Sequence, residues 1–233
     1  MRLPESIRAV TFDVGGTLVE PWPSVGHIYA EEAAKFGMAG LQPEVLNRQF
    51  ASVWKSRNDF DCSRAAWREL VNQTFASLSS EPPGQHCFDA IYNRFATAPA
   101  WRVFEDVFPV LEALRVRGFK LGIISNWDER LHPLLGELRL SDRFDAIVVS
   151  HDTGYMKPAP EIFRRASAQL GVAADSILHV GDSATEDVAG ARGAGMQAVL
   201  LDRALAQCND GAIPSLAELV VALAKAPPGA RPD

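Results

Sequence analysis

Short apolar segments recur along this chain, and they are what most limits the fold it can adopt. Each segment is hydrophobic almost without interruption, instead of alternating between apolar and polar residues. Continuous hydrophobicity is typical of strands that are buried on both faces, as in parallel sheets. The segments cover residues 7–13, 119–125, 144–150, 176–182 and 197–202. We therefore expect a buried parallel sheet.

Helical patterns lie between these segments. Apolar residues in 107–114 and in 162–170 are spaced as on one face of a helix, and Gly171 stands where the second helix would end. Ser215 and Glu218 have the spacing of a capping box, which predicts the start of a last helix. Strands alternating with helices predict an α/β fold with a doubly wound, Rossmann-like parallel sheet.

One long segment departs from this alternation. Residues 20–98 show helical patterns without a convincing strand, so we interpret them as an inserted all-helical cap domain. Residues 1–19 together with 99–233 then form the α/β core domain. Aromatic residues at helical spacing in the insert are expected to pack in its interior, since such residues usually form a core.

Composition and charge narrow the class of partner. The formal net charge is -6 and no basic run is present, which argues against nucleic acid and favours a small soluble ligand. The three cysteines are widely separated and lack the spacing of a zinc site, as expected for free thiols in a reducing compartment. No segment has the pattern of a signal peptide or a membrane span, so we expect a cytoplasmic protein without a membrane partner. The oligomeric state is open.

Polar residues stand at the ends of three predicted strands. Asp13 ends the first, Ser125 and Asn126 end the second, and Asp182 ends the fourth. Ligands of open parallel sheets bind beyond the carboxyl ends of the strands, so these residues are expected to share a site. Two neighbouring carboxylates repel each other unless a cation lies between them, and their hard oxygens favour Mg²⁺.

Residues in the connecting loops would complete such a site. Gly16 and Thr17 follow Asp13, and their backbone N–H groups are candidates for binding a phosphate. Lys157 precedes a predicted helix, where its ammonium group would neutralise phosphoryl charge. Asp187 begins another helix and would anchor either Lys157 or a water molecule on the metal.

The order and spacing of these groups resemble the haloacid dehalogenase superfamily, whose phosphohydrolases depend on Mg²⁺. The first motif of that family is similar to FDVGGTL at 12–18, the second to IISN at 123–126, the third to YMKPAPEIF at 155–163 and the fourth to GDSATEDVAGARGAGM at 181–196. The resemblance covers nearly the whole predicted core, and the helical insert lies where one type of cap is found in that family.

The resemblance implies a role for each matched residue. Asp13 would be the nucleophile that forms an aspartyl-phosphate, and Mg²⁺ would be held by Asp13, the backbone carbonyl of Gly15 and Asp182. Ser125 and Lys157 would bind the phosphoryl group. The implied activity is hydrolysis of a small phosphorylated metabolite.

Gly15 is the one departure from the motif. Phosphatases of the family normally carry a second Asp at this position, which protonates the leaving oxygen and then activates water. Loss of such an acid typically costs about 10² to 10⁴ in rate. Its absence predicts slow turnover of alkyl phosphates, unless the leaving group is good or another group replaces the acid.

Other interpretations are open from the sequence. The chain would be a dehalogenase-type hydrolase if no metal were needed, or a phosphonatase-type hydrolase if Lys35 or Lys55 of the insert approached Asp13. It would be a scaffold that binds a phosphate ligand or a protein if turnover were lost. The five histidines show no metal-site or triad spacing and are expected at the surface or as satisfied core residues. Trp127 is expected at the pocket edge or packed beneath the insert.

Overall fold

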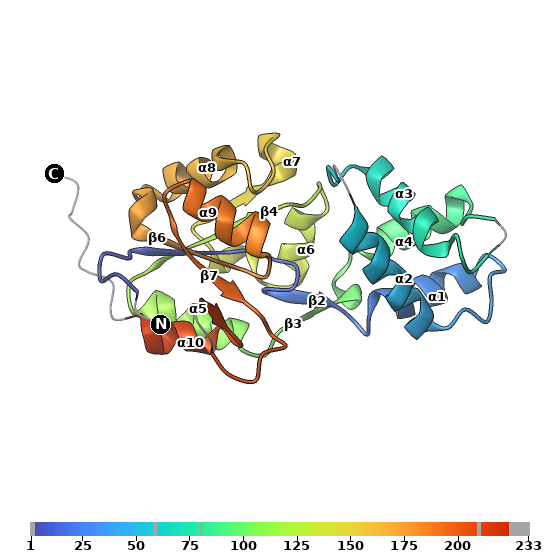
Figure 1. Ribbon diagram of the computed structural model, residues 1–233, viewed down its shortest axis with the longest axis horizontal. Coiled ribbons are helices and arrows are strands. Elements are labelled where there is room, and N and C mark those ends of the chain that lie inside the picture. Colours follow the sequence, from blue (N-terminus) through green and yellow to red (C-terminus); the bar gives the residue numbers. More distant parts are fainter. Residues whose placement is uncertain (1–2, 58–59, 80, 209–210, 224–233) are drawn as a thin grey trace. The chain divides into compact units, whose positions relative to one another are not determined.

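The chain divides into two compact units. The structure is a computed structural model that describes residues 3–57, 60–79, 81–208 and 211–223 (Figure 1). The first unit, called the sheet unit, consists of Met1–Val19, Val103–Glu129 and Arg139–Asp233. The second, called the helical unit, consists of Glu20–Arg102 and Arg130–Leu138. The helical unit thus takes in a second, separate segment besides the 20–98 region that the sequence predicts as an insert.

A six-stranded parallel sheet is the centre of the sheet unit. Its strands lie in the order β5, β4, β1, β6, β7, β8, and every neighbouring pair is parallel. This confirms the predicted α/β fold. The strand bounds are β1 (Ala9–Phe12), β4 (Lys120–Ser125), β5 (Ala146–Val149), β6 (Ile177–Gly181), β7 (Gln197–Leu201) and β8 (Ala212–Ile213).

The middle strands are buried because they are apolar on both faces. All four residues of β1 are fully buried, and in the parallel register Phe12 lies beside Ile123 of β4 and Val180 of β6. This register aligns the carboxyl ends of three adjacent strands. Residues that follow those ends therefore come together at one edge of the sheet.

Helices cover both faces of the sheet (Figure 1). One face carries α7 (Ser150–Thr153), α8 (Pro160–Leu170), the π-helix η4 (Ala184–Ala189) and α9 (Gly190–Gly193), and the other carries α5 (Val107–Val116) and α10 (Ala217–Ala222). The core beneath the first group joins residues of the strands to those of α8 and α9, among them Ile124, Val148, Phe163 and Ala191. Single 3₁₀ turns, η2 (Ser141–Arg143) and η3 (Ala174–Ser176), lead into β5 and β6.

The ends of two helices test two predictions that the sequence made from local residues. Helix α8 ends at Gly171, whose φ of 63° is the left-handed conformation that glycine adopts most readily, as the sequence predicts. The capping box predicted for the last helix is wrong. Helix α10 has Leu216 at its N-cap, and the Ser215 hydroxyl donates to Oδ2 of Asp106 at 2.7 Å while it accepts from the N–H of Ala217, rather than of Glu218, at 3.1 Å.

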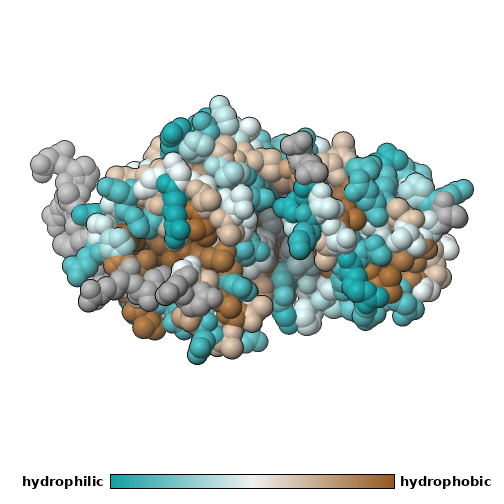
Figure 2. All heavy atoms as spheres, viewed as in Figure 1, coloured by the Kyte–Doolittle hydropathy of each residue, from teal (hydrophilic) through white to brown (hydrophobic). Residues whose placement is uncertain are grey.

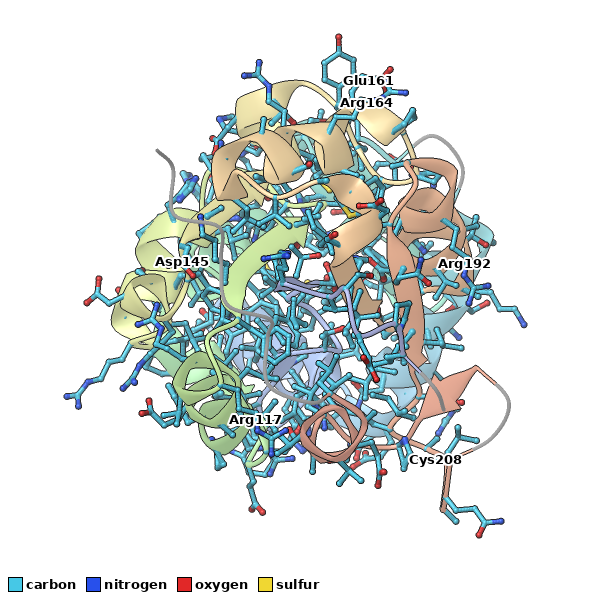
Figure 3. All side chains as sticks on the ribbon, turned by 90° about the vertical axis from the view of Figure 1, so that its left-hand side faces the viewer. Arg117, Asp145, Glu161, Arg164, Arg192 and Cys208 are labelled. Atoms are coloured by element: carbon cyan, nitrogen blue, oxygen red, sulfur yellow. The ribbon has the colours of Figure 1, made fainter. Side chains whose placement is uncertain are left out.

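Two side-chain interactions lie at the surface of the sheet unit. Figure 3 places Arg117 between α5 and α10, where its guanidinium donates to the backbone carbonyls of Val220 and Leu223. These carbonyls belong to the last turn of α10, which leaves such groups without helical partners. On α8, the exposed Glu161 and Arg164 form an ion pair at 3.6 Å (Figure 3).

The helical unit packs four helices around a core of its own. These are α1 (Val25–Ala34), α2 (Pro43–Ser56), α3 (Arg64–Phe75) and α4 (Gln85–Arg94), and α6 (Leu131–Glu137) belongs to the same unit. Tyr29 is fully buried and contacts the rings of Phe50, Phe75 and Phe95. Phe36 lies beyond the end of α1 and is exposed.

Two short strands flank the predicted insert, and of their residues only Glu20 and Pro21 lie within 20–98. Strand β2 (Val19–Pro21) pairs with β3 (Trp101–Val103), and the 3₁₀ turn η1 (Ala98–Ala100) precedes β3. Each strand has three residues, which is too short for an alternating pattern to be recognised in the sequence.

The viewed surface mixes polar and apolar residues in both units (Figure 2). Val116 of α5 and Val221 of α10 are among the large apolar side chains left exposed. Within the described residues, the helices are all too short or too polar to cross a membrane.

Candidate active site

Three adjacent strands place an acidic cluster at one edge of the sheet. Asp13 directly follows β1, Asp182 directly follows β6, and Asp187 lies one turn further along in η4. One carboxylate oxygen from each of the three lies within 4.8 Å of the others. Asp13 and Asp187 are buried, whereas Asp182 is exposed. The sequence prediction that Asp13 and Asp182 meet across neighbouring strands is therefore confirmed.

Lys157 joins two of these carboxylates. Its Nζ lies 2.7 Å from Oδ1 of Asp13 and 2.6 Å from Oδ1 of Asp187, and the side chain is buried. Ser125, the last residue of β4, donates its hydroxyl to the same Oδ1 of Asp13 at 3.1 Å. The ammonium and the hydroxyl thus converge on one oxygen of Asp13.

These contacts shift the pKa values of the charged groups. Burial lowers the pKa of Lys157, but the carboxylates of Asp13 and Asp187 outweigh it and hold that pKa above its ordinary value. Burial and the neighbouring Asp187 raise the pKa of Asp13 against the opposing effect of Lys157. The pKa of Asp187 lies below its ordinary value, because Lys157 and His179 outweigh the effect of burial.

Asp182 has the most unusual carboxyl of the cluster. Although this residue reaches the surface, protein on its inner side removes water, and Asp13 and Asp187 add like charge. Together these effects raise the pKa of Asp182 to about 7. The position therefore favours either a proton or a cation.

Asn126 holds Lys157 in place. Its Oδ1 accepts from the backbone N–H of Lys157 at 2.7 Å, and its Nδ2 donates to the Lys157 carbonyl at 3.0 Å and to Oε2 of Glu186 at 3.2 Å. Both amide hydrogens are therefore in use. The expectation that Asn126 supplies a neutral donor to a bound phosphate stays a prediction.

Backbone N–H groups of the loop after Asp13 donate to carbonyls of the same loop. The N–H of Gly16 donates to the Val19 carbonyl at 2.8 Å, and the N–H of Thr17 donates to the Val14 carbonyl at 3.3 Å. The expectation that these two N–H groups bind phosphate stays a prediction, and in this structure both N–H groups donate within the loop. The Thr17 hydroxyl is buried and has no hydrogen-bond partner among the described residues.

The two glycines of this loop differ in what they allow. Gly16 has a φ of 75°, and a Cβ atom there would lie 2.3 Å from Oδ2 of Asp182, so only glycine fits. At Gly15 a Cβ atom would meet Cζ3 of Trp127 at 3.4 Å, which is ordinary contact. Trp127 is thus the side chain that faces the position without a carboxylate.

His179 is a part of the site that the motifs do not reveal. It lies fully buried in β6, with Nε2 3.0 Å from Oδ1 of Asp187 and Nδ1 2.9 Å from Oγ1 of Thr11. A carboxylate can only accept, so Nε2 carries the proton. This meets the expectation of a satisfied core histidine, and it adds a contact to the Asp187 carboxylate. A polar residue within the apolar run SILHVGD was the available signal.

Both carboxylate oxygens of Asp187 accept hydrogen bonds. Its Oδ2 accepts from the backbone N–H of Ser183 at 3.0 Å, while Lys157 and His179 bind Oδ1. A Cβ atom at Gly181 would lie 2.1 Å from its Cγ, so glycine at the end of β6 makes room for this carboxylate. The predicted contact between Asp187 and Lys157 is present.

The residues present fit a divalent cation. Three carboxylates against one ammonium leave two negative charges when all four groups are ionised. Because Asp187 is engaged by Lys157, His179 and Ser183, the carboxylates of Asp13 and Asp182 are the ones available to a metal. Hard oxygen donors of this kind suit Mg²⁺.

Comparisons with known proteins agree with this geometry. A family model described as haloacid dehalogenase-like hydrolase matches residues 7–195. Haloacid dehalogenase-like hydrolase domain-containing protein 3 of Danio rerio is 33% identical over 87% of each chain. A glyceraldehyde 3-phosphate phosphatase of Methanopyrus kandleri is 30% identical over 84% of each chain.

Solved structures share the fold. A HAD phosphatase from Thermococcus onnurineus superposes with a TM-score of 0.63 at 27% identity, covering 91% of this chain and 96% of that one. A 2-haloacid dehalogenase from Pseudomonas syringae superposes with a TM-score of 0.62 at 25% identity, covering 93% and 98%. With the sheet, the acidic cluster and the family match in agreement, the chain belongs to the haloacid dehalogenase-like hydrolases.

Proposed function

We propose that the chain is a Mg²⁺-dependent phosphohydrolase of a small phosphorylated metabolite, with Asp13 as the nucleophile. The observation that carries the proposal is the convergence of Lys157 Nζ and Ser125 Oγ on one oxygen of Asp13, beside Asp182. The relatives described as phosphatases support this reaction class.

The chain's own residues divide the work of phosphoryl transfer. A carboxylate oxygen of Asp13 attacks phosphorus, the bond from phosphorus to the leaving oxygen breaks, and an aspartyl-phosphate forms. Lys157 and Ser125 donate to the phosphoryl oxygens, and Lys157 keeps its proton because Asp187 stays beside it. His179 and Ser183 hold Asp187 in that position. Asn126 fixes the backbone from which Lys157 extends.

A bound Mg²⁺ would add positive charge where phosphate and carboxylates meet. Asp13 and Asp182 would hold it through their carboxylates, together with the backbone carbonyl of Gly15. It would offset the net negative charge of the cluster and thereby let a phosphate dianion approach.

The alternatives have less support from the described contacts. A phosphonatase would need a desolvated lysine, yet Lys35 is largely exposed and paired with both oxygens of Glu32, and Lys55 is exposed. A dehalogenase expels halide without a metal, and would not need the raised-pKa Asp182 beside the nucleophile. A scaffold that only binds would not need Ser125 and Lys157 on the same oxygen.

Phosphate release from acetyl phosphate and p-nitrophenyl phosphate, with and without Mg²⁺, tests the proposal. We expect Mg²⁺-dependent release that falls on the order of 10³-fold or more in Asp13→Asn, because the attacking oxygen is lost. Asp175→Asn is the matched control, since Asp175 is exposed and precedes β6 at the opposite edge of the sheet. Equal release by wild type and Asp13→Asn would refute the proposal.

The covalent intermediate gives a second readout. Because Gly15 supplies no base to activate water, we expect the aspartyl-phosphate to persist after brief exposure to acetyl phosphate. Intact mass spectrometry would show the adduct on wild type and its absence from Asp13→Asn.

A further inference from the structure

The contact between Gly15 and Trp127 bears on which phosphates the site accepts. A side chain at Gly15 would fit, because its first atom would be in ordinary contact with Cζ3 of Trp127 and its φ lies outside the left-handed region. Space therefore does not force glycine here, in contrast to Gly16. With glycine at position 15, the site has no side chain there that can donate a proton.

Trp127 is held firmly in this position. Its backbone N–H donates to Oγ of Ser150 at 3.0 Å, and the same hydroxyl donates to the Trp127 carbonyl at 2.9 Å. The N–H of His151 donates to that carbonyl as well, at 3.2 Å. Ser150 is buried, so the backbone at Trp127 is fixed between β4 and α7. The backbone that carries the ring is therefore fixed beside Gly15.

Neither Gly15 nor the facing part of Trp127 can donate a proton to the leaving oxygen. Gly15 has no acid, and the part of Trp127 that faces it is ring carbon. An alkoxide without a proton is a poor leaving group, and an acid at such a position is worth about 10² to 10⁴ in rate. An aryl, enol or acyl oxygen leaves as a stabilised anion and gains little from that acid.

Building on the proposed function, we propose that this site selects phosphates whose leaving oxygen departs as a stabilised anion, and that Trp127 provides a flat face for an aromatic leaving group. In the first step the bond from Asp13 oxygen to phosphorus forms while the bond from phosphorus to the leaving oxygen breaks. The leaving oxygen keeps the electron pair, and no proton moves.

In the second step, water hydrolyses the aspartyl-phosphate. Water oxygen bonds to phosphorus, the bond between phosphorus and Asp13 breaks, and Asp13 regains its carboxylate. The proton of the water passes to solvent. Slow second-step chemistry is the consequence of the same missing side chain.

A series of phosphates tests the leaving-group preference. We would measure kcat/KM with p-nitrophenyl, phenyl, acetyl and ethyl phosphate in saturating Mg²⁺, for wild type, Gly15→Asp and Gly15→Asn. Wild type should prefer p-nitrophenyl over ethyl phosphate by a factor close to the ratio of their uncatalysed reactivities, because no acid assists the poorer leaving group. In Gly15→Asp the ratio of ethyl to p-nitrophenyl rates should rise about 10²-fold, because an acid is restored. Gly15→Asn has the same shape without the acid and should leave that ratio near the wild-type value.

Trp127 variants test the flat face. In Trp127→Leu the ratio of phenyl to acetyl phosphate kcat/KM should fall about 5- to 10-fold, because stacking on the ring is lost. Trp127→Phe keeps a flat ring and should restore most of that ratio. An unchanged ratio in a folded Trp127→Leu would overturn the flat face, and if that variant fails to fold, the Gly15 comparison still tests the leaving-group preference.

The outcomes separate this inference from the function on which it rests. Ethyl phosphate hydrolysed as well as p-nitrophenyl phosphate, with dependence on Asp13, would overturn the inference and leave the phosphohydrolase intact. A ratio that is the same in Gly15→Asp and Gly15→Asn would overturn it too. No Asp13-dependent release and no adduct from any phosphate would overturn both.

Discussion

Lys157 shows how one charge is kept inside a buried site. Two carboxylates contact its ammonium, and their combined attraction exceeds the cost of removing it from water. Substitution of a single partner would leave a buried charge uncompensated. The lysine and its acids therefore act as a unit, and their individual effects on activity are not expected to add.

At the same scale, His179 is expected to position Asp187. In His179→Leu both Thr11 Oγ1 and Asp187 Oδ1 lose a partner in the core. We expect the free energy of unfolding to fall by about 1 to 3 kcal/mol, and kcat to fall more than KM changes as Lys157 loses its fixed neighbour. Urea unfolding and steady-state kinetics measure the two effects.

The control for this variant is His86→Leu, since His86 is exposed on α4. His179→Gln should recover part of the activity if the ring acts by hydrogen bonding to Asp187. Full activity in His179→Leu would show that Asp187 is placed without it.

The loop between β1 and β2 behaves as an element whose glycines are not equivalent. Gly16→Ala is expected to reduce Mg²⁺-dependent turnover strongly, because the new methyl would meet the Asp182 carboxylate and the residue would need a left-handed φ. Gly15→Ala is the matched variant and should fold with stability close to wild type. Thermal unfolding and phosphate release on the pair would show this, and equal behaviour of the two variants would contradict the geometry.

A second element-scale feature is the clasp formed by Arg203, Asp106 and Ser215. Asp106, at the start of α5, accepts from the two terminal guanidinium nitrogens of Arg203, from the Ser215 hydroxyl and from the N–H of Leu216. Arg203 also donates to the Thr17 carbonyl at 2.7 Å. The clasp thus connects the loop after Asp13 to the beginnings of α5 and α10.

The pKa of Asp106 gives the clasp a pH dependence. Burial raises this pKa, but Arg203, Ser215 and Leu216 outweigh it and hold the pKa below its ordinary value. The stabilisation is therefore complete above about pH 4, the pKa of an unfolded Asp, and is lost as pH falls through the lower folded pKa. In Asp106→Asn, chemical unfolding at pH 7 should show lower stability and a flatter decline toward acid. A decline as steep as that of wild type would assign the acid sensitivity to other carboxyls.

At the scale of the whole molecule, the acidic cluster should make stability depend on Mg²⁺ and pH. The pKa of Asp182 is raised to about 7, so the folded chain binds more protons than the unfolded chain between about pH 4 and 7. The free energy of unfolding should therefore fall as pH rises through that window when metal is removed by chelation. Mg²⁺ at pH 8 should raise Tm, since it binds the folded form.

Asp182→Asn supplies the comparison for this prediction. Without the carboxylate, both the loss of stability toward pH 7 and the rise of Tm with Mg²⁺ should shrink. Differential scanning calorimetry across the pH series measures both. A Tm in Asp182→Asn that responds to Mg²⁺ as wild type does would place the metal elsewhere.

Much of the fold follows from local signals in the sequence. Continuous apolar runs indicated five of the six strands of the sheet, and Gly171 marked the end of α8. The missed strands β2, β3 and β8 have two or three residues each, too few for a pattern. The predicted capping box is not formed, since the Ser215 hydroxyl donates to Asp106, more than 100 residues away in sequence, and accepts from Ala217 instead of Glu218.

The sequence by itself determined the sheet and the four motifs, and therefore the meeting of Asp13 and Asp182, because strand ends in a parallel sheet share one edge. It did not determine which hydrogen bonds those motifs make. Only the tertiary structure turned the N–H groups of the first loop inward, assigned Asn126 to the lysine backbone, and placed His179 behind Asp187. Such pairings join residues distant in sequence, and every buried polar group takes the partner that packing brings within reach.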